Sequence, residues 1–152
     1  MNRHSLSELS ALLSDDHVFV DSQDRRVTGR DAMLTAWAAY FGMFPDYQIV
    51  ADTMITRGGM VAIFGHASGM FCGQRGPVPE SRITMPAAWR AIVLAGKIQV
   101  WQVYADWSEG MRVIERETNM ANPKAPEPSA ETVTDTATRS TPPVGGGSAH
   151  DR

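Results

Sequence analysis

The sequence predicts an α+β fold in which N-terminal helices pack on one face of a curved antiparallel or mixed β-sheet. Two observations lead to this class. Large apolar residues recur at spacings of three and four over residues 30–44, which is the pattern of a buried helix face. Several runs between residues 47 and 107 are enriched in Val, Ile and aromatic residues, which favours strands. Helices followed by an antiparallel meander are typical of α+β domains, and a curved sheet closed by helices forms a cone with an internal pocket.

The elements are expected in the order helix, strand, helix and then four strands. The longest helix is expected over residues 30–44, where Pro45 and Asp46 end it. Glycines in 57–59 and 94–97 indicate hairpin turns, and the Gly- and Pro-containing segment 72–79 indicates a loop. The remaining expected elements are a helix at 7–13, strands at 18–21, 47–55, 60–71, 83–94 and 98–107, and a short last helix at 109–117.

The composition of the chain changes near Thr118. The 152 residues are 43% hydrophobic, which is enough for one domain with a core. After Thr118, however, there is no aromatic residue, and five of the nine prolines fall there. Such a segment cannot bury enough apolar surface to offset its conformational entropy. We therefore predict a domain over residues 1–117 and a disordered, low-complexity tail over 118–152.

Charge and cysteine content restrict the class of protein. The formal net charge is −3, so no basic face for nucleic acid is expected. The single cysteine, Cys72, cannot form an internal disulfide, as is usual in a reducing compartment. Residues 1–14 lack the apolar segment of a signal peptide, and no apolar run approaches the roughly 18 residues that span a membrane. We expect a soluble cytoplasmic protein without membrane or nucleic-acid partners.

Asp21 is the candidate catalytic residue. It follows the alternating strand that contains Phe19, and alternation places both side chains on the same face. If that face lines the pocket, desolvation would raise the pKa of Asp21 towards the working pH, which suits a general acid or base. The alternative is a turn residue whose carboxylate accepts hydrogen bonds from the backbone amides of Gln23 or Asp24.

Large apolar side chains are expected to surround Asp21. Trp37, Trp89 and Trp101 are predicted to point inward, where they would fill the core or line the pocket, and the core role is favoured. The same alternation and helix periodicity add further lining residues. Together, the expected pocket residues are Phe19, Trp37, Phe41, Met85, Trp89, Trp101 and Val103.

Other polar residues are less suited to chemistry. Alternation places Arg90 on the outer face of the sheet, the face opposite to that of Trp89. A register shifted by one residue would instead bring Arg90 into the pocket, where it would pair with Asp21 and lower the pKa of that acid. His66 is expected on the outer face of the sheet, and Cys72 lacks a neighbouring His motif for nucleophilic catalysis. No cluster has metal-ligand spacing, so we expect no metal and no cofactor. The remaining histidines, also without partners at that spacing, are His4, His17 and His150.

Four motifs, taken in order, resemble one known family. They are Asp-Asp-x-Val-Phe-Val-Asp from residue 15, Val-Thr-Gly-Arg-Asp-Ala from 27, Phe-Pro-Asp-Tyr-Gln-Ile from 44, and Gly-Lys-Ile-Gln-Val-Trp-Gln-Val-Tyr-Ala-Asp-Trp from 96. The sequence over residues 7–110 resembles the SnoaL-like branch of the nuclear transport factor 2-like superfamily, which includes ketosteroid isomerases, limonene epoxide hydrolases and polyketide cyclases. This resemblance implies the cone fold, whereas one such fold hosts many functions.

The resemblance implies an incomplete catalytic set. The general base of ketosteroid isomerase, a well-known case of pKa tuning by the protein environment, falls at Asp21. The acid that helps to bind the oxyanion falls at Trp89 or Ala88, and the partner tyrosine lies on a longer first helix than this chain has. The charged residues of the epoxide hydrolases fall at Gly65, Ala67 and Val103, and the polyketide-cyclase acid falls near Asp106, which alternation places on the outer face.

From these features we expect an acid/base isomerase, cyclase or dehydratase that uses Asp21 on an apolar, carbonyl-containing substrate. The alternative is a non-catalytic ligand-binding or dimerisation module of the same fold. The resemblance also implies a homodimer formed through the outer face of the sheet. Residues expected near that interface are Phe64, His66, Gln102 and Tyr104.

Overall fold

The structure is a computed structural model that describes residues 1–121. The predicted disordered tail lies outside the described residues, except for its first part. Residues 118–121 continue the last helix, so the helix extends beyond the predicted domain boundary at residue 117.

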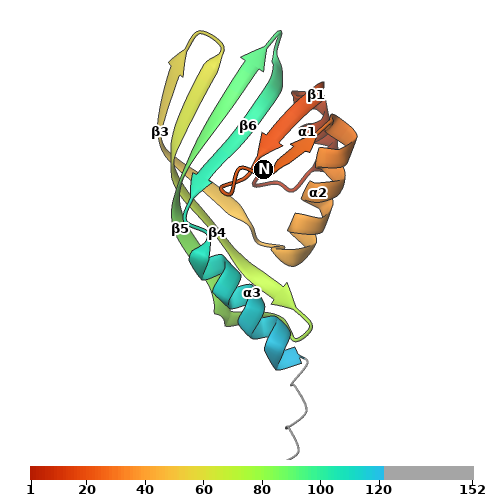
Figure 1. Cartoon of the computed structure of the whole chain (residues 1–152), viewed down its shortest axis with the longest axis vertical. Helices are drawn as coiled ribbons and strands as arrows, with labels where there is room; N and C mark the ends of the chain where they lie inside the picture. The colour runs from red at the N-terminus through yellow and green to blue at the C-terminus, as the bar shows by residue number, and fades with distance from the viewer. Residues whose placement is uncertain (122–152) are drawn as a thin grey trace, which may run out of the picture.

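Three helices and a six-stranded sheet make up the described chain (Figure 1). The strand order is β2-β1-β6-β5-β4-β3, in which β1 and β6 are parallel and all other neighbours are antiparallel. The sheet is therefore mixed and curved, as the sequence predicted, and its edge strands β2 and β3 do not pair with each other. The elements are α1 (Leu6–Leu12), β1 (Leu13–Val20), β2 (Arg26–Thr28), α2 (Arg30–Met43), β3 (Gln48–Arg57), β4 (Met60–Gly73), β5 (Gly76–Leu94), β6 (Lys97–Ala105) and α3 (Ser108–Ala121).

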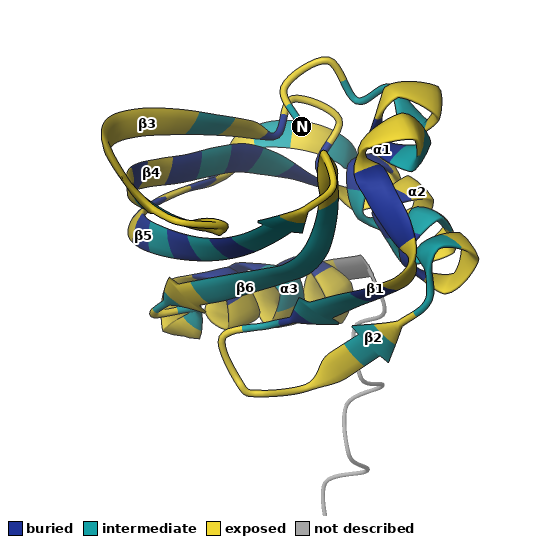
Figure 2. Ribbon diagram, turned by 90° about the horizontal axis from the view of Figure 1, so that it is seen from above, coloured by how far each residue is buried: buried dark blue, intermediate teal, exposed yellow. Residues whose placement is uncertain are grey.

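Helix α2 follows the predicted pattern. Gly29 precedes it with a φ of 95°, a conformation that glycine adopts without steric cost. The helix buries Met33, Trp37 and Phe41. Figure 2 shows α2 beside the sheet, with exposed residues on its outer side. It ends at Met43, two residues before Pro45, because the residue before a proline is disfavoured in the helical region.

Three parts of the element prediction were wrong. The predicted loop 72–79 is the tip of a long β4–β5 hairpin, in which Cys72 pairs with Pro77 and Gly73 with Gly76. Prolines are tolerated there because β6 pairs with β5 only from Ala87 onward, so this part of β5 has a single neighbour. Strand β1 begins at Leu13 rather than at residue 18, and the short strand β2 was not predicted.

The two faces of the sheet are distinct. Cross-strand pairing places Ile63, Trp89 and Val103 in one row on the inner face. The adjacent row on the outer face contains Phe64, Ala88 and Tyr104. The core lies between the inner face, α2 and α3. No helix within residues 1–121 is long and apolar enough to cross a membrane.

Candidate functional site

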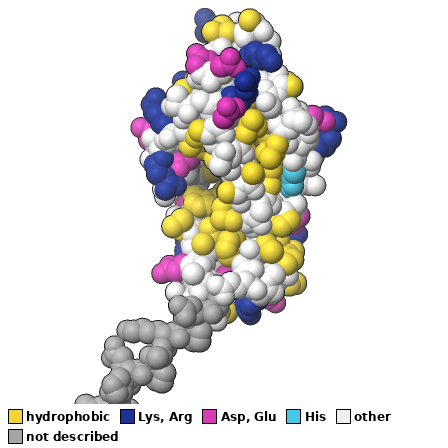
Figure 3. All heavy atoms as spheres, turned by 90° about the vertical axis from the view of Figure 1, so that its right-hand side faces the viewer, with side chains coloured by type: hydrophobic (Ala, Val, Ile, Leu, Met, Phe, Trp, Pro, Cys, Tyr) yellow, Lys and Arg dark blue, Asp and Glu magenta, His cyan; other side chains and the backbone are white. Residues whose placement is uncertain are grey.

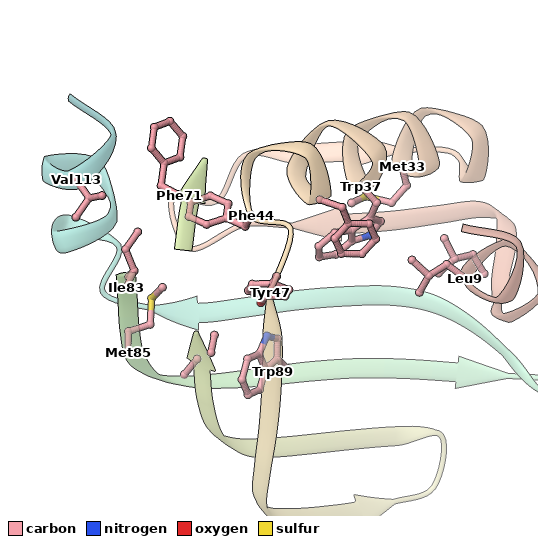
Figure 4. Close-up of a cluster of buried hydrophobic side chains, with 14 residues drawn as sticks. Leu9, Met33, Trp37, Phe44, Tyr47, Phe71, Ile83, Met85, Trp89 and Val113 are labelled. Carbon is pink, nitrogen blue, oxygen red and sulfur yellow. The ribbon is translucent and has the colours of Figure 1, made fainter. Parts of the chain in front are cut away.

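A cavity of about 380 Å³ lies between the inner face of the sheet and α2. The β1–β2 loop and α3 complete its walls. In Figure 4, Met33 and Trp37 project from α2, Trp89 of β5 lies across Tyr47 from Trp37, and Met85 of β5 lies beside Ile83 towards α3. The lining side chains are Phe19, Asp21, Ser22, Gln23, Arg25, Val27, Met33, Ala36, Trp37, Tyr40, Met43, Phe44, Tyr47, Ala67, Met85, Ala87, Trp89, Val103, Ala105, Trp107, Met111 and Ile114.

Small side chains on the inner face create the space. Ala67 of β4, Ala87 of β5 and Ala105 of β6 all line the cavity, and Ala87 pairs directly with Ala105. Alanines at these positions leave a hollow in front of the sheet, whereas larger side chains would fill it as in an ordinary core. The cavity is therefore encoded by residue size at a few strand positions.

The part of the cavity opening between α2 and α3 is apolar. Met43 at the end of α2 and Met111 on α3 both line the cavity and are both exposed to solvent. Figure 3 shows hydrophobic side chains gathered on this side of the molecule around a hollow, with charged side chains at their border. Methionine is flexible and polarizable, so a rim of this kind adapts to apolar ligands of different shapes.

Helix α3 supplies one wall. Trp107 precedes the helix, and its indole lies over Gly110, where a Cβ atom would come within 2.7 Å of the ring. Trp107 also makes an edge contact with Phe44, with ring centroids 6.0 Å apart. The absence of a side chain at Gly110 thus lets the indole pack against the first turn of α3 and border the cavity.

Asp21 organises the β1–β2 loop. Its Oδ1 atom accepts hydrogen bonds from the backbone amides of Gln23 (2.8 Å) and Arg25 (2.9 Å). Its Oδ2 atom accepts a hydrogen bond from Nε of Arg25 at 2.7 Å. The backbone adds two further bonds, from the Asp21 amide to the Arg25 carbonyl and from the Asp24 amide to the Asp21 carbonyl. The carboxylate therefore acts as the turn-forming group that the sequence allowed as an alternative, while it also lines the cavity.

The electrostatics of Asp21 differ from the expectation. Burial alone would raise its pKa, but the hydrogen bonds from Arg25 and Gln23, together with the charge of Arg25, outweigh that effect and lower the pKa. The expected rise of the pKa towards neutral pH was therefore wrong. The partner that lowers it is Arg25 of the same loop, whereas Arg90 does not line the cavity.

Two tyrosines give the apolar cavity hydrogen-bonding capacity. Tyr40 and Tyr47 lie edge to face, with ring centroids 5.1 Å apart. Burial raises the pKa of Tyr47 to about 12, and burial together with the neighbouring Tyr47 raises that of Tyr40 further. Both phenols are therefore neutral at physiological pH and can donate a hydrogen bond.

Neither phenol uses that hydrogen bond within the protein. Within residues 1–121, the hydrogen bond between Tyr47 and His4 is made by the backbone carbonyl of Tyr47, and neither hydroxyl has a hydrogen-bond partner. Neither hydroxyl oxygen is buried without a partner. In the described part of the chain, Arg90 Nε is the one side-chain atom in that state. Both hydroxyls are therefore in contact with solvent-accessible space, and both side chains line the cavity.

The structure brings together six of the eight residues expected at the site. Phe41 and Trp101 do not line the cavity. Phe41 turns towards the N-terminal segment, where it stacks on His4 with ring centroids 4.3 Å apart. Trp101 packs against the core, where it pairs with Phe19 of β1 and Ala91 of β5. The residues that do line the cavity are Asp21, Phe19, Trp37, Met85, Trp89 and Val103.

The other candidate residues lie elsewhere. His66 lies on the outer face, where its Nδ1 atom is 3.0 Å from Oδ2 of Asp52. Asp106 accepts a hydrogen bond from the Ser108 amide at the start of α3. Cys72 is a free thiol near the tip of the β4–β5 hairpin. In the described range, no group of three or more His, Cys, Asp or Glu side chains is arranged to hold a metal ion.

Several cavity residues were not expected at the site. Tyr40 could have been found, because it lies one helical turn after Trp37 on the same stripe of α2. The pairing of Arg25 with Asp21 depends on the loop conformation, and the contribution of Trp107 depends on how α3 docks. Neither of these has a signal in local sequence periodicity.

Comparison with known proteins agrees with this geometry. The family model described as a SnoaL-like domain matches residues 1–101. No curated protein is significantly similar in sequence.

Solved structures of low sequence identity share the fold. A protein from Jannaschia sp. CCS1, classed as a SnoaL-like polyketide cyclase, is 15% identical with a TM-score of 0.63, covering 72% of this chain and 77% of that one. An epoxide hydrolase from M. tuberculosis is 18% identical with a TM-score of 0.62, covering 81% and 87%. A Catenulispora acidiphila protein with a ketosteroid isomerase-like fold, bound to trimethylamine, is 20% identical with a TM-score of 0.61, covering 74% and 82%.

Proposed function

Because the chain belongs to the family of SnoaL-like domains, we propose that its cavity binds an apolar small molecule that carries a carbonyl group. The observation that carries this proposal is a cavity of about 380 Å³ whose walls are mostly apolar. At a share of about 30 Å³ per water molecule, about a dozen waters would fill it. Their release from apolar walls on ligand binding would be favourable.

The two phenols support a carbonyl in the ligand. Tyr40 and Tyr47 are neutral donors in surroundings that otherwise offer few hydrogen bonds. A carbonyl oxygen accepts hydrogen bonds and carries no charge. It can therefore enter an apolar cavity at a low desolvation cost when the cavity offers hydrogen-bond donors, such as these phenols. The same donors would stabilise negative charge that develops on that oxygen during a reaction.

Catalysis would use Asp21 as the proton-transfer group. Asp21 is the one carboxylate among the described lining residues, and its low pKa keeps it ionised at neutral pH, the form that accepts a proton. Removal of a proton next to a carbonyl would yield an oxyanion for the tyrosines to bind. Isomerisation, cyclisation and dehydration all include such a step.

The alternative is a ligand-binding module without turnover. It is favoured by one observation: both oxygens of Asp21 already accept hydrogen bonds from the loop. A carboxylate in this state is a weak base, because protonation would cost it the pairing with Arg25.

The experiment begins with a thermal-shift screen of aromatic and polycyclic ketones, since a ligand that binds only the folded state raises the melting temperature. Turnover of each hit is then measured for the wild type, for Asp21→Asn and for Asp24→Asn. The asparagine side chain in Asp21→Asn keeps an oxygen that can accept the two amide hydrogen bonds, so the loop is preserved while the base is lost. Asp24 lies in the same loop, does not line the cavity and serves as the matched control.

The enzyme hypothesis predicts that Asp21→Asn lowers the turnover rate by about 100-fold or more, the usual contribution of a general base, while ligand affinity stays within a few fold. Asp24→Asn should leave both unchanged. An unchanged rate in Asp21→Asn would remove Asp21 as the base. Binding without turnover for every hit would favour the binding module.

A further inference from the structure

We infer that the cavity is built for an amphiphilic anion, whose apolar body lies between the sheet and α2 and whose acidic head binds the guanidinium of Arg25 at the opening. This inference rests on the proposed function, because it names the class of ligand for the same cavity. It is carried by the position, pairing and open edge of Arg25.

The polar residues of the cavity are not spread over its walls. Apart from the two tyrosines and the tryptophan indoles, they come from one segment, the β1–β2 loop. This loop contributes Asp21, Ser22, Gln23 and Arg25, and Arg25 is the one cationic residue among the described lining residues. A ligand with a polar head would therefore place that head at the loop and its apolar part against the aromatic walls.

Arg25 is held in place by a single edge of its guanidinium. Nε donates to Oδ2 of Asp21 at 2.7 Å, and the backbone amide of Arg25 donates to Oδ1 of the same residue. The two terminal nitrogens donate no hydrogen bond to other residues of the described chain. The fork that binds carboxylates and sulfonates in two-point fashion is thus open to the solvent at the cavity.

The loop is ordered before any ligand binds. The Asp21 carboxylate anchors two amides, the backbone closes the loop through the Arg25 carbonyl, and Asp24 adopts a positive φ of 62° to complete the turn. The side chain of Arg25 is 74% exposed, whereas that of Asp21 is 24% exposed. The cation is therefore accessible to a ligand from solvent, and its counter-ion is the more buried partner of the pair. Binding would not require the loop to reorganise, which lowers the entropic cost.

An anionic head would also change Asp21. A ligand carboxylate on the terminal nitrogens competes for the charge of Arg25 and weakens its effect on Asp21. The ligand would then make Asp21 a better proton acceptor only while it is bound. Selection of the ligand and activation of the base would be linked through one arginine.

The test uses two fluorescent probes with the same apolar body. 8-Anilino-1-naphthalenesulfonate carries an acidic group, and N-phenyl-1-naphthylamine is its uncharged counterpart. Affinities of both are measured by fluorescence titration for the wild type, Arg25→Gln and Arg26→Gln. Arg26 is the adjacent residue in sequence, pairs with Asp24 at 3.8 Å and does not line the cavity, so its substitution makes the same change of net charge.

The inference predicts that Arg25→Gln weakens binding of the anionic probe by about three- to fivefold, the effect of a solvent-exposed ion pair. Binding of the neutral probe should not change. Arg26→Gln should leave both affinities as they are in the wild type. Raising the salt concentration should weaken anion binding to the wild type more than to Arg25→Gln, because exposed ion pairs are screened.

A cavity-filling variant, Ala105→Phe, locates the probes. It should abolish binding of both, and the far-ultraviolet circular dichroism spectrum shows whether it is folded; Met111→Trp at the opening is the second such variant. If the anionic probe still binds to both filled variants, it binds elsewhere and the inference fails. If the neutral probe binds in the cavity but Arg25→Gln does not affect the anion, only the inference fails. If neither probe binds to the wild type, the proposed function fails as well.

Discussion

His17 is a buried base whose burial sets a pH limit on stability. The residue is 1% exposed, and its Nδ1 atom donates a hydrogen bond to the carbonyl of Ile98 at 2.9 Å. Burial lowers its pKa, although the bond to Ile98 and the charge of Asp16 act in the opposite direction. The unfolded chain, with a histidine pKa of about 6.5, therefore binds a proton at a higher pH than the folded protein does.

This difference in proton binding makes the free energy of unfolding depend on pH. Above about pH 6.5 both states are neutral at His17 and the residue adds no pH dependence. Below it, protonation favours the unfolded state, so the free energy of unfolding falls as the pH decreases. We predict that His17→Gln, which keeps a hydrogen-bond donor but cannot titrate, makes this decrease shallower between pH 7 and 5. Urea unfolding at a series of pH values measures it, and equal slopes for variant and wild type would contradict the prediction.

The residue scale also shows what the sequence could predict about the site. Alternation in the strands correctly separated Trp89 from Arg90, because a period of two survives in a sheet whose inner face is buried. The environment of Asp21 could not be predicted in the same way. Its pKa depends on a contact with Arg25 that forms only when the loop adopts one conformation, and no periodicity encodes that conformation.

At the scale of elements, α3 is both a wall of the cavity and a separately anchored unit. Its attachment includes buried Val113 and a group of charges at the hairpin tip. Glu117 is 3% exposed and lies 2.6 Å from Arg75 and 3.3 Å from Arg116. The hydrogen bond from Arg75 is the main reason that the pKa of Glu117 is lowered. The charge pair thus ties the end of α3 to the β4–β5 hairpin.

We predict that Glu117→Gln loosens α3. The substitution leaves the cations of Arg75 and Arg116 near a neutral amide, so the helix should open more often. Hydrogen–deuterium exchange of its backbone amides should become faster in α3 and stay unchanged in β5 and β6. Glu115→Gln, an exposed position on the same helix, is the control with the same change of charge. The wild-type helix should loosen in the same way when the pH falls through the lowered pKa of Glu117. Unchanged exchange in Glu117→Gln would mean that apolar packing alone holds α3.

The β4–β5 hairpin explains why segment 72–79 was predicted as a loop. Glycine and proline usually end strands, and this segment contains four of them within eight residues. Here they lie where β5 pairs with β4 but no longer with β6. The missing amide of a proline therefore leaves no unpaired carbonyl inside the sheet. The neighbours of a strand are set by the topology of the whole sheet, so they cannot be predicted from local composition.

At the scale of the whole molecule, the outer face of the sheet exposes aromatic side chains to solvent. Phe64 and Tyr104 lie there in one row with Ala88 between them, and both aromatic side chains are about half exposed. In the next row, Nε of Arg90 is buried without a hydrogen-bond partner among residues 1–121. An apolar row beside an unsatisfied donor is typical of a surface that becomes covered.

We propose that two copies of the chain cover this face for each other. Phe64→Glu would place a charge in the apolar row, where burial against a second copy is costly. Light scattering after size exclusion should give a dimer for the wild type and a monomer for Phe64→Glu. Leu94→Glu, at an exposed position at the end of β5 and away from this row, should remain a dimer. A monomeric wild type at micromolar concentration, or a dimer that survives Phe64→Glu, would contradict the proposal, because a stable homodimer buries roughly 800 Å² or more on each copy and does not tolerate an unpaired charge in its buried part.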